Sequence, residues 1–540
     1  MPMPSRAKSA YWHCSVSDMF KLACKSLGCK LNQIETENIA GAFVQAGSSL
    51  VPWNDKADVY LINTCTVTSK AEQKARREIR LALSKNPHAV VIITGCYAEL
   101  DADQLNFGPR ALVIPGSRKN TIAELAPALV NAVLDHFSLE EFVYQLKINA
   151  IQGDSRNGKD SKGTKGSRDR PDPFFFSFPH KLIHTRPFLK IQDGCSRRCA
   201  YCRVCIARGN PQSLPPHLVL ERVVLYEALG APEIVLTGVN LSLYYANGHT
   251  FEQLLAFLIK NTKSIKFRLS SWEPDRVSDA FLDLFAHPRV QPHLHLSIQS
   301  GSDAVLRCMN RPYTQAYVVT AVERLRCAKS TLFLGADFIS GFPGETEDDF
   351  MESLNLIHEL AVPGVHAFTF SPRQGTPAYT MKPKVPERIA VARTEALIMA
   401  GKEERANYVK HRIGAKSEII LEAPTDAGMS GITPDYLRVF IPSHNSGSES
   451  PLIKIRDKEF SEQYGQIFDG KNEQNGWERG EREPNSFASN RLESNNLEPN
   501  GLEPNSLEPG TECTHSLVGM LKPLGNPGLS DAFDVEAVLL

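Results

Sequence analysis

The sequence predicts an α/β protein of three units: an N-terminal open parallel α/β domain, a partial (βα)6 barrel and a small C-terminal β-barrel. Strand-like and helix-like stretches alternate up to about residue 409, and a polar stretch without apolar periodicity divides them into two groups. Short alternating strands separated by turns follow near the C-terminus. The chain has 540 residues, more than a single hydrophobic core usually organises, so several domains are expected.

The composition is that of an ordinary globular protein, with 42% hydrophobic and 22% charged residues. A net charge of -1 excludes a strongly basic chain, so any contact with nucleic acid must come from a local patch. The first 19 residues contain no apolar core of a signal peptide, and no stretch is long and apolar enough to be a membrane anchor. Twelve cysteines spread along the chain favour a reducing cytoplasm over a disulfide-bonded secreted protein.

The first unit, residues 20–145, carries three cysteines in a shared context. Cys29, Cys65 and Cys96 each lie just past an apolar, strand-like run. Because the carboxyl ends of parallel strands meet at one edge of a sheet, we expect these thiols to converge on one site. The alternative for any one of them is a buried thiol that packs as a small hydrophobic group, which is the role we assign to Cys14 and Cys24.

A polar linker is predicted at 146–179, because residues 152–173 are rich in glycine and charge and lack apolar periodicity. The second unit, 180–409, alternates strands with helices. Its candidate strands are Phe188–Gln192, Glu233–Thr237, Phe267–Ser270, His293–Ile298, Leu334–Ile339 and His366–Phe370. Six strand–helix repeats predict a parallel, barrel-like sheet with its site at the carboxyl ends of the strands.

A short loop after the first of these strands contains Cys195, Cys199 and Cys202 in a C-x3-C-x2-C spacing. Three thiolates leave one iron of a four-iron cluster open to another ligand. A zinc loop is the alternative, although zinc pairs usually come with a second, distant pair. Cys205 would close the cluster if it were a fourth ligand, but the spacing differs from that of ferredoxins, and we interpret it as an ordinary thiol in the following turn.

The third unit, 410–540, has strand-like runs near residues 417–422, 436–441, 516–521 and 533–539. An insertion at 444–514 separates them and contains a Leu-Glu-Pro-Asn element repeated with a period of five residues. Its polar, proline-rich composition cannot form a core, so we predict a disordered loop inserted into a small β-barrel.

Taken together, the two cysteine triples and the motifs around them resemble the methylthiotransferase family of radical S-adenosylmethionine enzymes. The resemblance covers nearly everything outside the two polar stretches. The motifs are Leu27-Gly-Cys-Lys, Asn63-Thr-Cys-Thr-Val-Thr, Gln192-Asp-Gly-Cys, Leu236-Thr-Gly-Val-Asn, Gln299-Ser-Gly-Ser, Gly341-Phe-Pro-Gly-Glu-Thr and Gly375-Thr-Pro. Cys205 stands where the family usually has a proline, which affects only the shape of that turn.

This resemblance implies a cytoplasmic enzyme that replaces a C–H of an adenine ring with C–SCH3. Its cofactors would be S-adenosylmethionine and two 4Fe-4S clusters, a catalytic one on Cys195, Cys199 and Cys202 and an auxiliary one on Cys29, Cys65 and Cys96. The C-terminal barrel would be an RNA-binding domain of the TRAM type. A flavodoxin- or ferredoxin-like electron donor and a sulfur donor would be partners, and no membrane is involved.

The same resemblance implies cofactor contacts at the strand ends of the second unit. These residues are Thr237, Gly238, Asn240, Ser271, Glu273, Gln299, Ser300, Gly301, Asp337 and Gly341. Backbone amides near Gly238 and Gly301 allow close approach to a ligand. A structural role is the alternative for each residue, most of all for the glycines of the Gly341-Phe-Pro-Gly-Glu turn. Arg311 and Arg373 are candidates for binding phosphate or carboxylate, with ion pairing at the surface as the alternative.

The segment after Cys65, with its basic helix at Lys74, Arg76, Arg77 and Arg80, looks most similar to the branch that acts on N6-threonylcarbamoyladenosine next to the tRNA anticodon. A solvated helix face is the alternative for these basic residues. Related branches act on N6-isopentenyladenosine in tRNA or on an aspartate of a ribosomal protein. A non-enzymatic iron-sulfur protein that binds RNA would need clusters closed by four protein ligands.

Overall fold

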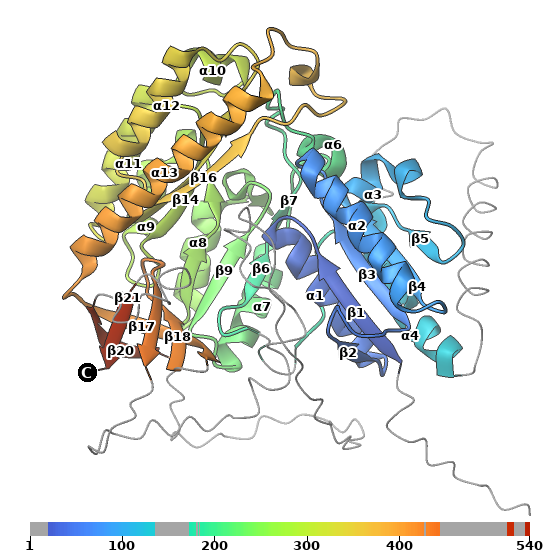
Figure 1. Cartoon of the computed structure of the whole chain (residues 1–540). Coiled ribbons are helices and arrows are strands. Elements are labelled where there is room, and N and C mark those ends of the chain that lie inside the picture. The colour runs from blue at the N-terminus through green and yellow to red at the C-terminus, as the bar shows by residue number, and fades with distance from the viewer. Residues whose placement is uncertain are drawn as a thin grey trace, which may run out of the picture.

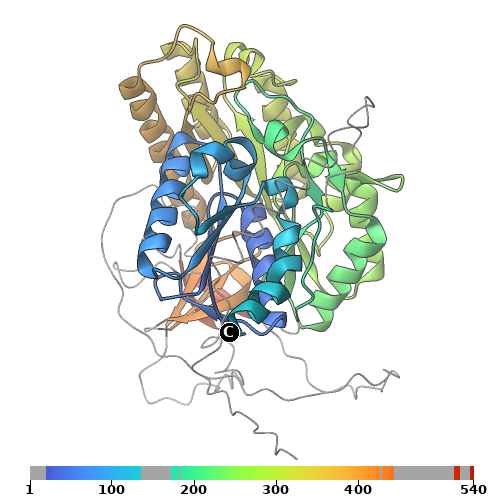
Figure 2. The same cartoon turned by 90° about the vertical axis from the view of Figure 1, so that its right-hand side faces the viewer.

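The computed structural model describes residues 20–134, 172–179, 182, 184–425 and 428–442, and the backbone of the strands Ser516–Lys522 and Val535–Leu539. The N-terminal sheet stands beside a larger curved sheet, with helix α1 between them, and the C-terminal strands lie at one end of the molecule (Figures 1 and 2). Within these residues, no helix is long and apolar enough to cross a membrane. The predicted insertion at 444–514 and Cys14 lie outside the described residues.

The N-terminal domain is an open, all-parallel sheet with strand order β2-β1-β3-β4-β5. The strands are β1 (Lys21–Ser26), β2 (Ser49–Val51), β3 (Val59–Thr64), β4 (Val90–Gly95) and β5 (Ala111–Val113), and the helices are α1 (Lys30–Gln45), α2 (Ser69–Lys85), α3 (Cys96–Leu100) and α4 (Asn120–Leu134). Every residue of β3 and β4 is buried, as expected of central parallel strands covered on both faces. The parallel α/β architecture predicted for this unit is confirmed.

The second unit is a curved sheet of parallel strands that stays open along one side. Its strands are β6 (Phe188–Lys190), β9 (Glu233–Thr237), β12 (Lys266–Leu269), β13 (Ser271–Trp272), β14 (His293–Gln299), β15 (Phe333–Ser340) and β16 (Gly364–Thr369), in the orders β12-β9-β6 and β13-β14-β15-β16. A single residue separates β12 from β13, so the two sheets continue one another as a partial barrel. The predicted (βα)6 arrangement is confirmed.

Helices cover the outer face of this curved sheet (Figure 1). They are α7 (Pro216–Ala228), α8 (Phe251–Asn261), α9 (Asp279–Phe285), α10 (Asp303–Cys308), α11 (Gln315–Ala328) and α12 (Glu347–Glu359), while the short α6 (Val204–Arg208) follows the cysteine loop. Two small antiparallel pairs, β7 (Gln192–Asp193) with β8 (Gln212–Ser213) and β10 (Tyr245–Ala246) with β11 (His249–Thr250), complete the unit. Helices α8 and α12 begin at capping boxes, which satisfy backbone N–H groups of their first turns.

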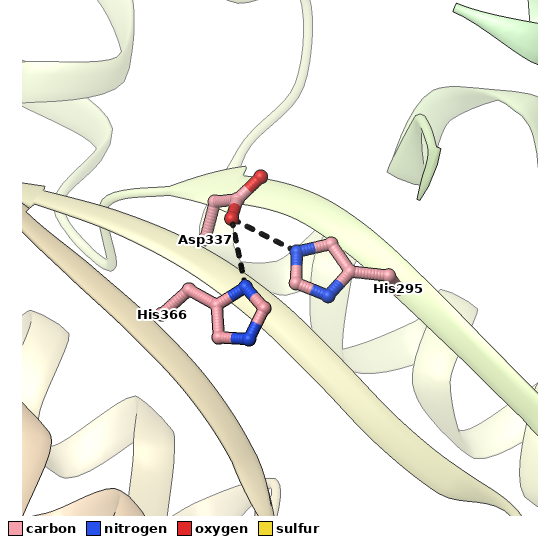
Figure 3. Close-up of side chains that lie close together, drawn as sticks. All are labelled: His295, Asp337 and His366. Atoms are coloured by element: carbon pink, nitrogen blue, oxygen red, sulfur yellow. Dashed lines mark ion pairs between the residues drawn. The ribbon is translucent and has the colours of Figure 1, made fainter. Parts of the chain in front are cut away.

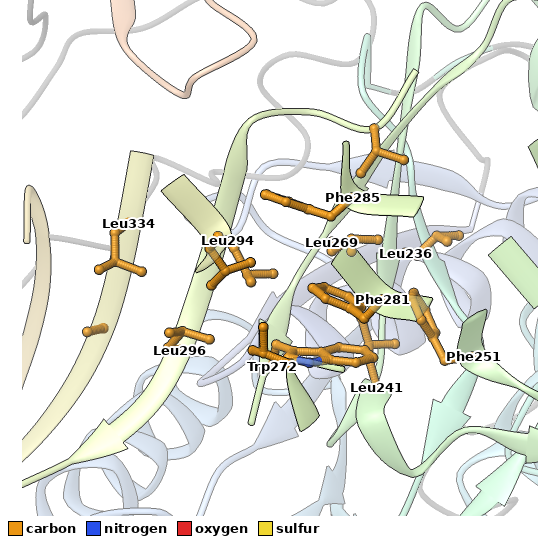
Figure 4. Close-up of a cluster of buried hydrophobic side chains, with 14 of the residues drawn as sticks. Leu236, Leu241, Phe251, Leu269, Trp272, Phe281, Phe285, Leu294, Leu296 and Leu334 are labelled. Atoms are coloured by element: carbon orange, nitrogen blue, oxygen red, sulfur yellow. The ribbon is translucent and has the colours of Figure 1, made fainter. Parts of the chain in front are cut away.

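The core of the second unit lies between the sheet and these helices (Figure 4). Trp272 stacks on Phe281 with ring centroids 4.3 Å apart, and Phe281 in turn stacks on Phe285. Leucines from β9, β12, β14 and β15 fill the space around these rings. Full burial of each such side chain stabilises the fold by about 1.5–3 kcal/mol, so this core holds the strand ends in place for the site above them.

Helix α13 (Glu387–Arg412) packs on β16 and α12 and leads into the C-terminal unit. The strands β17 (Lys416–Thr425), β18 (Gly428–Ile432), β19 (Arg438–Pro442), β20 (Ser516–Lys522) and β21 (Val535–Leu539) form a closed barrel in the order β17-β18-β19-β21-β20. Its apolar residues pack on Phe333, at the start of β15. The predicted small β-barrel is therefore confirmed as a fold.

Part of the predicted linker at 146–179 has a definite place in the structure. Residues 172–179 run along α1 and the second unit, and Phe174 is buried in the main core. Phe176 stacks edge-on against Phe178 and Tyr226. The run of aromatic residues explains this difference, because it provides the apolar surface that the glycine-rich stretch before it lacks. The residues before 172 lie outside the part that the structure describes.

Candidate functional site

The three cysteines of the N-terminal domain lie at the carboxyl ends of three adjacent strands. Cys29 follows β1, Cys65 follows β3 and Cys96 follows β4, and these strands are neighbours in the order β1-β3-β4. Gly28 allows Cys65 to approach closely, since a Cβ at this position would lie 2.7 Å from the Cys65 Sγ atom. The fold thus brings together three thiols that are far apart in the sequence, as the parallel-sheet argument predicted.

The environment of these thiols suits a metal cluster. All three line one cavity of about 370 Å³. The backbone N–H of Val67 donates to the Cys65 Sγ atom at 3.5 Å. Burial raises the pKa of Cys65 to about 12, and the neighbouring Cys29 and Cys96 add to this effect, because thiolates at this site would repel one another. An iron-sulfur cluster would neutralise that repulsion, and hydrogen bonds to cluster sulfurs are common, so the residues present fit such a group.

The second triple lies in the loop between β7 and α6. The backbone N–H of Arg197 donates to the Cys195 Sγ atom and that of Val204 donates to the Cys202 Sγ atom, both at 3.4 Å. Burial and the neighbouring Cys199 and Cys195 thiols raise the pKa of Cys202 to about 12. This loop therefore shows the same two features as the first triple, namely amide donors to sulfur and mutual proximity.

Cys205 lies in α6, and its thiol is 3.8 Å from the carbonyl oxygen of Cys202. The backbone of this turn thus offers the Cys205 thiol a local acceptor. This contact agrees with the interpretation of Cys205 as an ordinary thiol of the turn.

Arg311 connects the second triple to the strand ends. Its Nη1 atom donates to the Cys199 Sγ atom at 3.2 Å, and its Nη2 atom donates to Glu273 at 2.6 Å. Asn240 donates to the other carboxylate oxygen of Glu273 at 3.1 Å. Burial raises the pKa of Glu273, although Arg311 opposes this effect. Arg311 is therefore a buried contact between the cysteine loop and a predicted cofactor residue, not part of a surface ion pair.

A network of buried charges joins the two cysteine regions. Glu35, on α1 behind Cys29, pairs with Lys119 and Lys190, each at 2.6 Å, and with Arg208 at 2.9 Å. Asp193, two residues before Cys195, pairs with the same Lys190 and Arg208 at 2.6 and 3.0 Å. Since Arg208 also donates to Asn32 of α1, this network fixes the N-terminal domain against the loop of the second triple.

A second link runs through Thr66, the residue after Cys65. Its hydroxyl accepts hydrogen bonds from Arg203 at 3.2 Å and from Arg373 at 3.0 Å. Arg373 is buried and also pairs with Glu72 of α2. Because Arg203 follows Cys202 directly, Thr66 is a bridge between the loops of the two triples.

The predicted cofactor residues divide into three groups. Thr237, Gly238, Ser271 and Asp337 line the same cavity as Cys29, Cys65 and Cys96. Asn240 and Glu273 lie beside Arg311, and Gln299 ends β14 with a φ of +73°. The remaining three, Ser300, Gly301 and Gly341, pack against neighbouring helices.

The contacts of this third group are with helices behind the sheet. The N–H of Gly301 donates to Ser353 of α12 at 2.8 Å, and the Ser300 hydroxyl lies 3.2 Å from the same oxygen. A Cβ at Gly341 would lie 2.2 Å from that of Ala390 in α13. These contacts pack α12 and α13 against the strand ends, and the cofactor contacts of Ser300, Gly301 and Gly341 stay a prediction.

The cavity also has two histidines that the sequence argument missed, His295 and His366, beside the predicted Asp337. His295, Asp337 and His366 lie side by side on β14, β15 and β16 (Figure 3). Burial by itself would raise the pKa of Asp337, but His295 and His366 outweigh it and hold this pKa well below its usual range. The alternation His293-Leu-His295 places both imidazoles of β14 on one face of the sheet. This alternation was the one sequence signal that could have predicted a histidine in the cavity.

Lys30 is the other residue that was missed. It follows Cys29 directly, lines the cavity, and lies over the rings of Phe188 and Tyr436, 5.4 and 6.0 Å from their centroids. Among the described residues, no carboxylate forms an ion pair with Lys30. Its position directly after a predicted cluster ligand was the only sequence signal for it.

Comparisons with known proteins agree with the two-part organisation. Residues 21–114 match the uncharacterized protein family UPF0004, and residues 189–357 match the radical SAM superfamily. The threonylcarbamoyladenosine tRNA methylthiotransferase MtaB of Treponema pallidum is 39% identical over 441 residues, covering 75% of this chain and 91% of that protein. The protein of the same name from Aquifex aeolicus is 32% identical, covering 73% of this chain and 91% of that protein.

A relative with another name is somewhat less similar. The tRNA-2-methylthio-N(6)-dimethylallyladenosine synthase of Akkermansia muciniphila is 29% identical over 442 residues, covering 78% of this chain and 93% of that protein. The relatives are thus matched over nearly their whole length. On this basis the chain belongs to the methylthiotransferase family of radical S-adenosylmethionine enzymes.

Proposed function

We propose that this enzyme methylthiolates N6-threonylcarbamoyladenosine in tRNA, converting a C–H bond of the adenine ring into C–SCH3. The observation that carries the proposal is the cavity of about 370 Å³ that Cys29, Cys65 and Cys96 share with Thr237, Gly238 and Ser271. A substrate base in this space would contact the auxiliary thiols on one side and the predicted cofactor residues on the other.

We assign the two cysteine triples to two clusters. Cys195, Cys199 and Cys202 would hold the 4Fe-4S cluster that binds S-adenosylmethionine, and Cys29, Cys65 and Cys96 would hold an auxiliary cluster. The first cluster and its cofactor would supply the one-electron chemistry that activates the C–H bond, and the second would supply the sulfur. The protein keeps these groups apart and orients them, because the buried charges and Thr66 fix one cysteine loop against the other.

The charges of the cavity support the threonylcarbamoyl branch. Its lining contains Lys30, Arg405 and Arg438, as well as Arg208, which already pairs with Glu35 and Asp193, whereas Asp337 is the one carboxylate among the described lining residues and pairs with histidines. A threonylcarbamoyl group carries a carboxylate, which a cationic lining would bind. An isopentenyl group is apolar and would gain nothing from these charges.

Contacts with tRNA would come from local surfaces, since the net charge is near neutral. On α2, which begins beside the Cys65 loop, Lys74, Arg77 and Arg80 are exposed. The small C-terminal barrel, in which we propose a TRAM-type domain, is a second surface. A single-stranded anticodon loop suits both, because its bases are free to leave the stack and enter a pocket.

The proposed domain boundaries are 20–145 for the auxiliary-cluster domain, 180–409 for the radical core and 410–540 for the RNA-binding barrel. The proposed partners are a flavodoxin- or ferredoxin-like electron donor and a sulfur donor. We place the reaction in the cytoplasm, where a reducing environment keeps cluster thiolates available.

The test is to incubate the enzyme, with its clusters reconstituted anaerobically, with S-adenosylmethionine, a reductant, a sulfur source and tRNA that carries either threonylcarbamoyladenosine or isopentenyladenosine. Mass spectrometry of the nucleosides should show the methylthio mass gain only on threonylcarbamoyladenosine. Product only on isopentenyladenosine would show that the enzyme belongs to the branch that acts on this nucleoside. Product on a ribosomal protein and on neither tRNA would show that the enzyme does not modify tRNA.

A further inference from the structure

Three side chains on the inner face of the curved sheet form a compact donor set. The Asp337 Oδ1 atom lies 2.9 Å from His295 Nε2 and 3.7 Å from His366 Nδ1, and all three ligand atoms lie within 4.8 Å of one another (Figure 3). The two imidazole rings face each other with centroids 4.8 Å apart. The set comes from three adjacent strands, so the sheet itself fixes its geometry.

We propose that His295, Asp337 and His366 bind a single divalent transition-metal ion of the zinc or ferrous class, a site separate from both cysteine triples. Two neutral imidazoles and one carboxylate are a ligand set that such ions prefer, and the single negative charge suits a divalent cation. Three protein ligands also leave coordination positions open, as in catalytic rather than structural sites.

The distances agree with this assignment. Ligand atoms about 2.1 Å from a metal ion in tetrahedral or octahedral geometry lie roughly 3.0–3.5 Å from one another. The two separations from Asp337 Oδ1, 2.9 and 3.7 Å, bracket that range, and the two imidazole nitrogens lie within 4.8 Å of each other. Rotation of the imidazole rings would bring all three atoms to an ion placed among them.

The backbone makes room for this arrangement. Gly335, in the middle of β15 and opposite His295 in the strand pairing, would place a Cβ 2.4 Å from the His295 Nδ1 atom. Glycine in the interior of a strand weakens the strand, so its presence often marks a close approach of another group. Here the space is filled by the His295 ring, whose Nε2 atom points to Asp337.

The position of the set gives the ion access to a ligand. All three side chains line the cavity that Cys29, Cys65 and Cys96 also line, and they retain exposed fractions of 12%, 26% and 33% for His295, Asp337 and His366. The open coordination positions would thus face the cavity, where a carboxylate or carbonyl oxygen of a bound molecule is the chemistry they accept. The site does not depend on which nucleoside is the substrate.

The test uses the holoenzyme with both cysteine triples filled by clusters and adventitious metal removed by a chelator. Isothermal titration with Zn²⁺ should show one site per chain. Asp337→Asn and His366→Ala should weaken its affinity by more than about 100-fold, because loss of a direct ligand exceeds the 10–100-fold cost of losing an outer partner. The matched control is His217→Ala, on the exposed face of α7, which should leave the affinity unchanged.

X-ray absorption at the zinc edge of the wild-type holoenzyme provides a readout that does not depend on the folding of any variant. Nitrogen and oxygen ligands at about 2.0–2.2 Å with imidazole scattering support the site, whereas sulfur at about 2.3 Å would assign the zinc to cysteines. A wild-type protein that takes up no more Zn²⁺ than Asp337→Asn would overturn the proposal and leave a hydrogen-bonded His–Asp–His triad. Neither result bears on methylthiolation, which is measured separately on tRNA.

Discussion

The two cysteine triples reach similar surroundings by opposite routes. Cys195, Cys199 and Cys202 come from one loop within eight residues of sequence, whereas Cys29, Cys65 and Cys96 come from the ends of three strands. Both triples have backbone N–H donors to sulfur, and each has a buried thiol, Cys65 or Cys202, whose pKa is raised by burial and by its neighbouring cysteines. The loop triple is visible in sequence spacing alone, but the strand triple exists only because the parallel sheet orders β1, β3 and β4 side by side.

The difference predicts how each triple depends on the rest of the protein. A loop carries its own ligand spacing, so its main requirement is the contact of Arg311 with Cys199. The strand triple depends on the whole N-terminal sheet and on the buried charges that fix the sheet against the loop. The predictions below test this contrast, beginning with the largest effect.

Cys199→Ala should abolish the reductive cleavage of S-adenosylmethionine, because this residue would hold one iron of the cluster that binds the cofactor. The measurement is deoxyadenosine release under reducing conditions. Iron should fall from about eight to about four per chain if each triple holds one four-iron cluster. The matched control, Cys205→Ala, should retain cleavage. Normal deoxyadenosine release by Cys199→Ala would show that the loop triple does not hold the cluster that cleaves the cofactor.

Glu35→Gln should lower the free energy of unfolding by about 3–5 kcal/mol, because it leaves Lys119, Lys190 and Arg208 with one carboxylate fewer in a buried site. Urea unfolding of the cluster-free protein measures this loss. The control is Glu124→Gln on the exposed side of α4, which should change stability by less than about 0.5 kcal/mol. Equal effects of the two substitutions would show that the charge network does not hold the domains together.

The same carboxylate predicts a pH dependence. Burial opposes ionisation of Glu35, but Arg208, Lys119 and Lys190 outweigh it and hold the pKa of Glu35 well below its usual range. Its stabilising contribution is therefore complete above the pKa of an unfolded glutamate, about 4.3, and declines as the pH falls below that value. Below pH 4.3 the wild type should lose stability more steeply than Glu35→Gln, and parallel curves would contradict this assignment.

Lys30→Ala should raise the KM for tRNA bearing threonylcarbamoyladenosine roughly 10- to 100-fold, since a charge-assisted hydrogen bond contributes roughly 1.5–3 kcal/mol. Iron content and deoxyadenosine release without tRNA should stay at wild-type levels, and Lys30→Arg should restore part of the affinity. An unchanged KM would show that Lys30 does not contact the carboxylate of the substrate.

Arg77→Glu combined with Arg80→Glu should produce the smallest effect, a moderate loss of tRNA affinity with chemistry intact. If each arginine contacts one phosphate, the dependence of log affinity on log salt should become shallower by about one per residue. Lys260→Glu with Lys263→Glu, at the end of α8, is the charge-matched control. Equal losses in both double variants would indicate a general charge effect instead of a binding face on α2.

Much of the architecture followed from sequence because it depends on local patterns. Apolar periodicity predicted the buried runs of β3 and β4, the six parallel strands and the strands of the barrel. It did not predict the contacts between elements that are distant in the sequence. Glu35 and Arg208 meet only in the folded chain, and the pairing of Asp337 with two histidines depends on the register of three strands.

The predicted cofactor residues show the same limit. Strand-end position correctly indicated which segments reach the cavity, as for Thr237 and Ser271. It could not separate these from Gly301 and Gly341, whose neighbours in α12 and α13 come from later in the chain. A strand end fixes the place of a residue, while its role depends on which helix packs behind it.

The most direct test of the account is a single reaction with Cys65→Ala, in which deoxyadenosine and methylthiolated nucleoside are measured in the same tube. Because the two triples would carry separate chemistries, we expect deoxyadenosine to form at near wild-type levels, no methylthiolated nucleoside, and an iron content of about four per chain. Methylthiolated product together with full iron content would contradict the account and would show that Cys65 is a buried thiol that only packs in the core.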